Sequence, residues 1–328
     1  MKHYAVVLFF AAGLAVGLFG SKLSENSFSS VAFKEVRGGG GGGGGGGFIN
    51  SLLECEIGEK LLASEIKPFK SKVQDLVDSL IEQKRASAVS VYFRDLNNGP
   101  WFGINEKETF SPASLLKVPF MMAAFKQAEK NPGFLERQVL YSGPTNTTEE
   151  YFKSAVNLEP NKTYPMKEVI RHMIINSDNN AKDLVLKNLD GKLLTDIYSQ
   201  LGVEAPEIGK TDDFITIKNY ASFFRILFNS SYLNQEFSNK ALSILSEVEF
   251  KNGLAAGVPE NVKIAHKFGE REYFGKNQLH DCGIVYYPNR PYLLCVMNRG
   301  ENFETLARDI ADISKLTYKE VDKQFGSK

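Results

Sequence analysis

The positions of the strand-forming patterns constrain the fold of this chain more than any other feature. Two such patterns lie near the start, at 88–93 and 101–104, on either side of an Asn-Asn-Gly-Pro turn. Three more lie near the end, at 263–268, 283–287 and 292–297. The first pair predicts a hairpin, and the last three predict an antiparallel meander. We therefore expect one five-stranded antiparallel sheet that is assembled from both ends of the folded region.

Apolar residues at helical spacing account for most of the remaining sequence. A stripe within 48–85 predicts an amphipathic helix: Val73, Leu76, Val77, Leu80 and Ile81. A second stripe predicts a C-terminal helix over 302–325, and the spacing over 121–200 and 216–250 is mainly helical. The expected fold class is α/β, with a sheet flanked by N- and C-terminal helices and an all-helical subdomain inserted at about 120–258.

The first 47 residues differ in composition from the rest of the chain. Residues 1–22 are a short charged start followed by an apolar run, which is typical of a secretory signal or an uncleaved N-terminal anchor. Residues 23–47 end in ten consecutive glycines, which predicts a flexible linker. We therefore expect an exported protein, either secreted, periplasmic or anchored to the outer face of the membrane, whose folded domain spans 48–328.

Composition and charge argue against several classes of function. The 39 basic and 39 acidic residues balance, whereas nucleic-acid binding favours a basic excess. The four histidines show no zinc-hydrolase spacing, so we expect no metal and no organic cofactor. Three cysteines allow one disulfide at most, and the pairings among Cys55, Cys282 and Cys295 all stay open. We expect a monomer that meets a membrane only through its N-terminal segment.

The first chemical motif lies in the stretch that follows the early hairpin. Ser111 and Pro112 suit the N-cap and first position of a helix, which would put Ser114 in the first turn beside unpaired backbone N–H groups. Lys117 follows three residues later, on the same helix face, where its neutral amine could take the proton of the serine. A second Ser-x-x-Lys at 64–67 shows that this pattern is weak on its own.

Two further motifs, by their order and placement, strengthen the prediction that Ser114 and Lys117 belong to an active site. Ser177-Asp178-Asn179 ends a predicted helix, and Lys267-Phe268-Gly269 lies on the first strand of the meander. Short look-alikes occur at 24–26 and 251–253, so neither motif is specific alone. A serine at a helix start, a polar triplet at a helix end and a lysine on a strand are together far more specific.

In this order and context, the three motifs resemble the Ser-x-x-Lys, Ser-Asp-Asn and Lys-Thr-Gly set of class A β-lactamases and penicillin-binding proteins. The likeness runs from about residue 88 to the C-terminus, and 167–181 is especially similar to the helix of that family that leads into Ser-Asp-Asn. The resemblance implies the two-subdomain β-lactamase-like fold and a serine hydrolase that works through an acyl-enzyme.

The resemblance also implies a role for each motif residue. Ser114 would attack a carbonyl carbon with Lys117 as base, and Ser177 would relay a proton to the leaving nitrogen. Asn179 would bind the substrate amide, and Lys267 would meet a substrate carboxylate. The charge of Lys267 should also lower the pKa of Lys117, because like charges disfavour ionisation.

Three neighbouring positions take supporting roles on the same grounds. The backbone N–H groups of Ser114 and Glu270 would form the oxyanion hole, where each donor is worth about 3 kcal/mol in the transition state. Gly269 would lie against the bound substrate. Asp178 is expected to brace its loop and to do no chemistry.

The chain departs from the family pattern in two places. Class A enzymes deacylate with a glutamate on a long loop, but 203–214 is short and holds no Glu-x-x-x-Asn. Glu207, Asp212 and Asp213 are the substitutes that this segment offers, although a solvated turn carboxylate is the simpler interpretation of each. Phe268 stands where the family has a hydroxyl residue that meets the substrate carboxylate, which puts ligand preference in doubt.

These residues leave three functional hypotheses. The first is hydrolysis of β-lactams, with a small-molecule β-lactam as substrate. The second is a D-Ala-D-Ala peptidase or penicillin-binding protein that acts on a peptidoglycan stem peptide, which needs no deacylating glutamate. The third is a binding module that keeps the fold and cleft without useful catalysis.

Overall fold

A computed structural model gives the fold of the chain. It describes residues 47–50, 66–97, 99–145, 149–200, 213–273 and 275–326. The predicted signal or anchor and nearly all of the predicted linker lie outside these residues, as does Cys55. Residues 46–328 belong to one compact unit. Within the described part, none of the helices combines the length and the apolar content that crossing a bilayer requires.

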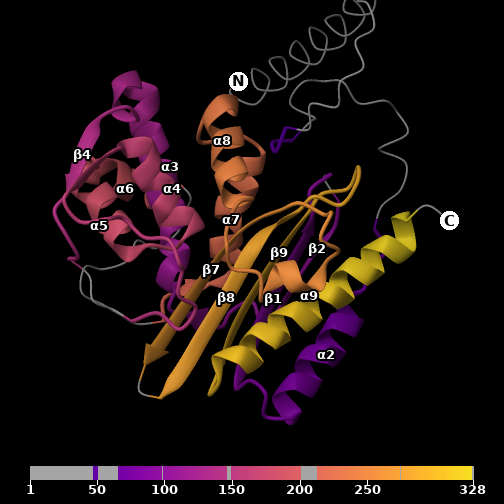
Figure 1. Ribbon diagram of the computed structural model, residues 1–328. Helices are drawn as coiled ribbons and strands as arrows, with labels where there is room; N and C mark the ends of the chain where they lie inside the picture. The colour runs from indigo at the N-terminus through magenta and orange to yellow at the C-terminus, as the bar shows by residue number, and fades with distance from the viewer. Residues whose placement is uncertain are drawn as a thin grey trace, which may run out of the picture. The chain divides into compact units, whose positions relative to one another are not determined.

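The expected five-stranded sheet is present, and it joins the two ends of the folded region (Figure 1). Its strands are antiparallel and run in this order: β2 (Trp101–Ile104), β1 (Ala88–Asp95), β9 (Tyr292–Gly300), β8 (Lys276–Val285) and β7 (Ile264–Tyr273). The junction is the pairing of β1 with β9, in which Ala88 lies opposite Arg299. The predicted fold class is therefore confirmed.

Strands β7 and β8 are longer than the sequence pattern indicates. They continue as a paired hairpin to Tyr273 and Lys276, beyond the predicted ends at 268 and 283. The added part is rich in charged residues, which hides the strand pattern that apolar alternation would show. Two small sheets were also missed: β3 (Thr109–Phe110) with β6 (Ile215–Thr216), and β4 (Gln138–Tyr141) with β5 (Lys162–Pro165).

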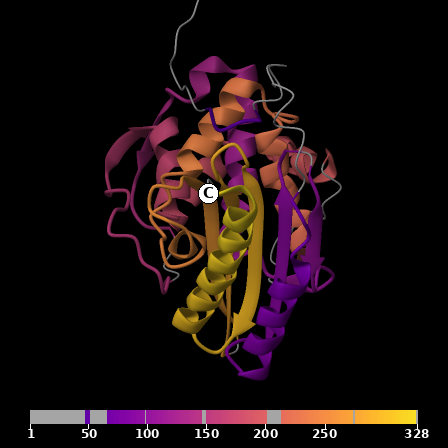
Figure 2. The same ribbon diagram turned by 90° about the vertical axis from the view of Figure 1, so that its right-hand side faces the viewer.

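Two helices from opposite ends of the folded region cover one face of the sheet. These are α2 (Lys70–Glu82) and α9 (Phe303–Phe325), which lie side by side in Figure 2. Each buries an apolar stripe, and its fully buried members include Val73, Val77, Leu306, Ile310 and Ile313. Ile81 does not belong to the stripe as predicted, because 36% of its surface is exposed.

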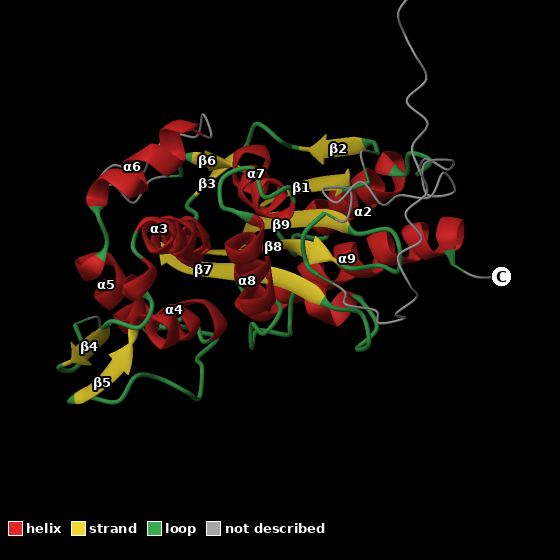
Figure 3. Ribbon diagram, turned by 90° about the horizontal axis from the view of Figure 1, so that it is seen from above, coloured by secondary structure: helices red, strands yellow, loops and turns green. Residues whose placement is uncertain are grey.

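The other helices build the rest of the molecule (Figure 3). α7 (Ile217–Phe228) contacts β9, and α8 (Gln235–Leu245) contacts β7. The remaining helices are α3 (Lys117–Lys130), α4 (Met166–Ile175), α5 (Asn179–Asn188) and α6 (Gly191–Gln200). Among the described residues, three single 3₁₀ turns complete the list: η3 (Ala113–Leu116), η4 (Pro132–Phe134) and η5 (Leu254–Gly257).

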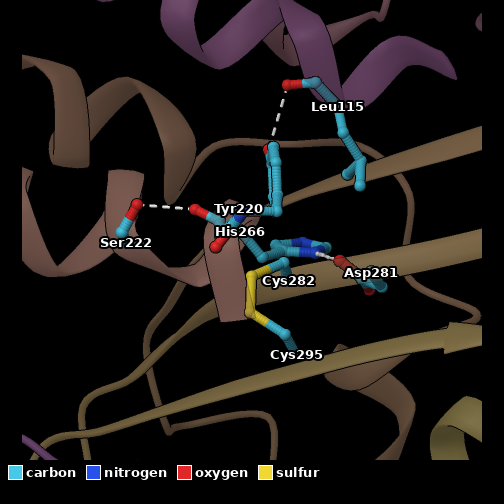
Figure 4. Close-up of a disulfide and its surroundings, with 8 residues drawn as sticks. Leu115, Tyr220, Ser222, His266, Asp281, Cys282 and Cys295 are labelled. Carbon is cyan, nitrogen blue, oxygen red and sulfur yellow. Dashed lines mark hydrogen bonds and ion pairs between the residues drawn. A yellow bond between two sulfur atoms is a disulfide. The ribbon is translucent and has the colours of Figure 1, made fainter. Parts of the chain in front are cut away.

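A disulfide joins the last two strands of the late meander (Figure 4). Cys282 on β8 lies opposite Cys295 on β9, and the two side chains are bonded. Beside it, His266 Nδ1 lies 2.8 Å from Asp281 Oδ1, and both side chains are buried. The disulfide is therefore one of the three pairings that the sequence left open.

Turn η3, which carries Ser114, is held from two sides. Tyr220 donates from its hydroxyl to the carbonyl of Leu115 at 3.0 Å (Figure 4). On the other side η3 packs directly on β7 at Gly269, where a Cβ atom would lie 2.8 Å from Pro112 O and 2.9 Å from Leu115 N. Only a residue without a side chain allows this backbone contact. Gly269 thus serves close packing and is buried, rather than lying against the cleft as expected.

The N-cap prediction for Ser111 was wrong. The helical segment opens with η3 at Ala113, whose φ is +48°, and the α-helix itself starts only at Lys117. The hydroxyl of Ser111 accepts a hydrogen bond from Arg271 at 2.5 Å instead of capping the turn. A long-range contact with β7 has replaced the local one that the sequence indicated.

Substitution of Gly269 tests the contact between η3 and β7. In Gly269→Ala the new methyl group would meet rigid backbone atoms, so we expect the free energy of unfolding to fall by about 1–3 kcal/mol. Urea denaturation followed by circular dichroism measures it. Gly191→Ala is the matched control, because nothing lies within 4 Å of its Cβ position, and it should stay within about 0.5 kcal/mol of wild type. Equal stability of both variants would contradict the packing argument.

Candidate active site

The Ser114 hydroxyl and the Lys117 amine meet as their spacing predicted. Ser114 lies in η3 and Lys117 is the first residue of α3, and Lys117 Nζ donates to Ser114 Oγ at 2.9 Å. Ser114 is half-buried and lines a cleft of about 910 Å³, whereas Lys117 is only 1% exposed. The serine can therefore meet a ligand from the cleft while its partner amine stays shielded from water.

Ser177 lies on the other side of the same amine. It occupies the corner between α4 and α5, where its φ of +56° is in the left-handed region. Lys117 Nζ donates to the carbonyl of Ser177 and, at 3.1 Å, to its hydroxyl. Lys267 Nζ donates to the same hydroxyl at 2.9 Å. The four predicted groups thus form one chain from Ser114 through Lys117 and Ser177 to Lys267.

Asp178 holds that corner in place, as expected. Its carboxylate caps α5 by accepting from the backbone N–H of Asn180 at 2.7 Å and of Ala181 at 3.1 Å. It also accepts from the N–H of Leu158 at 3.2 Å, which ties the preceding loop to the same point. The strained backbone of Ser177 is held by these contacts.

Lys267 is placed differently from the expectation. It is fully buried and does not line the cleft, and its amine donates to Ser177 Oγ and to the carbonyl of Phe268 at 2.9 Å each. Burial, followed by the charge of Lys117, holds the pKa of Lys267 well below its ordinary value. The structure therefore puts this amine behind Ser177, outside the lining of the cleft.

The pKa of Lys117 is lowered as predicted, but for a different main reason. Burial of the amine is the largest cause and brings the pKa to about 8, against an opposing effect of the Glu150 carboxylate. We expected the charge of Lys267 to do this. A buried amine loses its hydration, and this loss disfavours the ammonium form whether or not a second cation is near.

Phe268 does not face the cleft either. Its ring is 4% exposed and stacks on Phe250, with the ring centroids 4.2 Å apart. Phe152 adds an edge contact with Phe268 at 6.4 Å. The phenyl ring thus belongs to an aromatic cluster that holds residue 152, and it does not line the cleft.

The side chain of Glu270 has a role that the sequence did not indicate. Its carboxylate accepts hydrogen bonds from the backbone N–H of Tyr151 at 2.6 Å and of Phe152 at 3.2 Å. Burial raises the pKa of this carboxyl to about 6. Only the backbone N–H of Glu270, which follows Gly269 on β7 at the contact with η3, is predicted from the sequence to take part in the site.

Glu150 is the site residue that sequence reasoning missed. Its Oε1 accepts from Asn179 Nδ2 at 2.9 Å and lies 3.9 Å from Lys117 Nζ. Asn179, which is predicted to bind a substrate amide, lines the cleft and holds this carboxylate. Glu150 comes from an irregular segment that carries no motif, so no spacing pattern could have identified it.

The carboxylates proposed as substitutes do not take this place. Asp213 is bound elsewhere, because it accepts from Gln278 Nε2 at 2.8 Å and pairs with Arg299 at 2.5 Å. Glu207 and Asp212 lie outside the described residues. In the part of the chain that the structure describes, no group of three or more histidine, cysteine or acidic residues is arranged to hold a metal ion.

Known proteins with similar sequences are β-lactamases. A β-lactamase of Bacteroides uniformis is 25% identical over 272 residues, which cover 76% of this chain and 90% of that protein. A β-lactamase of Streptomyces albus G is 22% identical over 262 residues, which cover 72% of this chain and 81% of that protein.

Solved structures share the fold. PBP-A has a TM-score of 0.66 at 23% identity, over 79% of this chain and 99% of that one, and a mutant of PBP-A has been solved as an acyl-enzyme complex with penicillin G. A class A β-lactamase from Bacteroides cellulosilyticus DSM 14838 has a TM-score of 0.67 at 22% identity, over 77% of this chain and 98% of that one. At such identities these structures show the fold alone.

A family model settles the relationship. The model described as the β-lactamase enzyme family matches residues 68–321, which include all three motifs and every strand of the sheet. The expected resemblance is therefore confirmed, and this chain belongs to the β-lactamase enzyme family.

Proposed function

We propose that this protein opens β-lactam rings by acylation of Ser114 and then releases the product by hydrolysis. The observation that supports this most strongly is the hydrogen-bonded chain from Ser114 through Lys117 and Ser177 to Lys267. Such a chain provides a nucleophile, a base and a proton path in contact with one another. An exported protein would carry out this reaction outside the cytoplasm, and we propose that residues 1–22 direct or anchor it there.

In the acylation step, neutral Lys117 takes the proton of Ser114 as Oγ bonds to the lactam carbonyl carbon. The lactam C–N bond then breaks, and the nitrogen takes a proton from the hydroxyl of Ser177. Ser177 regains a proton from Lys117, which leaves Lys117 neutral again. Lys267 keeps the Ser177 hydroxyl oriented toward this path. We propose the backbone N–H groups of Ser114 and Glu270 as the oxyanion donors.

Penicillin binding without turnover is the second candidate function. It is favoured by the likeness to PBP-A and by the short segment at 203–214, which lacks the deacylating glutamate pattern of class A enzymes. A D-Ala-D-Ala peptide in peptidoglycan would then be the substrate. We expect the protein to act as a monomer in either case.

A chromogenic cephalosporin distinguishes these functions. We expect the full chain to develop colour continuously. Intact-mass spectra should show no adduct once the substrate is used up. Ser114→Ala should lose both colour and adduct, because the attacking oxygen is gone. Ser64→Ala removes the serine of the second Ser-x-x-Lys and should behave as wild type.

The other outcomes of this experiment are equally informative. One stable adduct per chain would indicate a penicillin-binding protein. Folded protein that gives neither colour nor adduct would contradict both catalytic proposals and indicate a binding module.

Acylation should depend on pH through Lys117. Only the neutral amine accepts a proton, so the rate of acylation should rise about tenfold per pH unit below a pKa of about 8 and level off above it. Stopped-flow measurement of the first turnover between pH 6 and pH 9 gives this rate. A rate that stays constant over the whole range would contradict the assignment of Lys117 as base.

A further inference from the structure

The segment that carries Glu150 is fixed to the sheet immediately after that residue. Glu270 on β7 accepts the backbone N–H groups of both Tyr151 and Phe152. The Phe152 ring packs on Phe250, with centroids 4.9 Å apart, and adds an edge contact with Phe303 at 6.3 Å. Two hydrogen bonds and an aromatic cluster therefore determine where the Glu150 side chain begins.

The Glu150 carboxylate and the nucleophile both lie close to the Lys117 amine. Lys117 Nζ is 2.9 Å from Ser114 Oγ and 3.9 Å from Glu150 Oε1, so these two oxygens are at most about 6.8 Å apart. A water that hydrogen-bonds to both sides of such a gap spans about 5–6 Å. The Glu150 side chain is 20% exposed and lines the cleft, so water can reach it.

One oxygen of this carboxylate is held and the other is available. The contacts with Asn179 and Lys117 both use Oε1. Within the described residues, no hydrogen bond engages Oε2. The side chain is thus oriented by one oxygen while the second can hold a water molecule.

We propose that Glu150 is the general base of deacylation, and that it activates the water that hydrolyses the acyl-Ser114 ester. The deacylating carboxylate then comes from the loop before α4, whereas class A enzymes take it from the loop that corresponds to 203–214, after α6. This inference rests on the proposed acylation of Ser114.

The proposed step balances in atoms and protons. Glu150 Oε2 takes a proton from water as the water oxygen bonds to the ester carbonyl carbon. Glu150 then passes this proton to neutral Lys117, whose amine lies 3.9 Å away. The bond from that carbon to Ser114 Oγ breaks, Oγ takes a proton from Lys117, and the site returns to its starting state with Glu150 ionised and Lys117 neutral.

The surroundings of Glu150 suit a base. Burial raises the pKa of its carboxyl above the ordinary value, against the opposing charges of Lys117 and Lys267. A carboxylate with a raised pKa takes a proton from water more readily. Glu270 also borders the cleft, but its carboxylate is engaged by two backbone N–H groups.

Glu150→Gln tests the proposal in the full chain. Glutamine can still accept the Asn179 hydrogen bond but cannot take a proton. With the chromogenic cephalosporin we expect a first-turnover acylation rate within about threefold of wild type and a deacylation rate lower by about 100- to 10,000-fold. Intact-mass spectra should therefore show a lasting adduct on the variant that wild type does not keep.

Two further variants make the result specific. Glu236→Gln changes an exposed carboxylate outside the cleft and should match wild type in both steps. Glu150→Asp keeps a carboxylate and should recover part of the deacylation rate that Glu150→Gln loses. Formation of a stoichiometric adduct on Glu150→Gln also demonstrates that this variant is folded.

Several results would overturn the proposal. If Glu150→Gln turns over at the wild-type rate, Glu150 is not the base of deacylation. If this variant also acylates faster than wild type, the carboxylate only blocks the cleft. A lasting adduct on wild type would show that Glu150 does not deacylate, while leaving acylation of Ser114 standing. If wild type forms no adduct and no colour, the proposed function itself fails and the role of Glu150 fails with it.

Discussion

The burial of one amine determines the rest of the site. Lys117 starts α3 in the core, and its Nζ contacts Ser114 on one side and Ser177 on the other. Taking an ammonium group out of water costs several kcal/mol, so the buried site favours the neutral amine. The same hydrogen bonds link η3 to the corner between α4 and α5. Burial therefore sets both the chemistry of the amine and the position of the nucleophile beside it.

The sequence could predict what depends on short-range pattern and chain order. Strand patterns at both ends were enough to predict the five-stranded sheet, whose two parts meet where β1 pairs with β9. The spacing of three residues brought Ser114 and Lys117 together. The order of the motifs predicted that Ser177 and Lys267, 90 residues apart, would meet.

What the sequence could not predict depends on contacts between distant segments. Glu150 and Asn179 are 29 residues apart, and Glu270 and Tyr151 are 119 apart, with no periodic pattern to indicate either pair. The direction of Phe268 follows from its stacking on Phe250, which a local motif does not encode. The N-cap prediction for Ser111 was wrong for the same reason, because the Ser111 hydroxyl accepts a hydrogen bond from Arg271 on the distant strand β7.

The central claim is that the fold keeps Lys117 as a weakly basic amine in contact with Ser114. The most direct test is an NMR titration of the full chain with labelled lysine side chains, in which Lys117→Arg identifies the resonance of Lys117. The account predicts a midpoint at a pKa of about 8. A midpoint at the ordinary lysine value of 10.5 would contradict it, because the amine would then be charged under the conditions in which it must accept a proton.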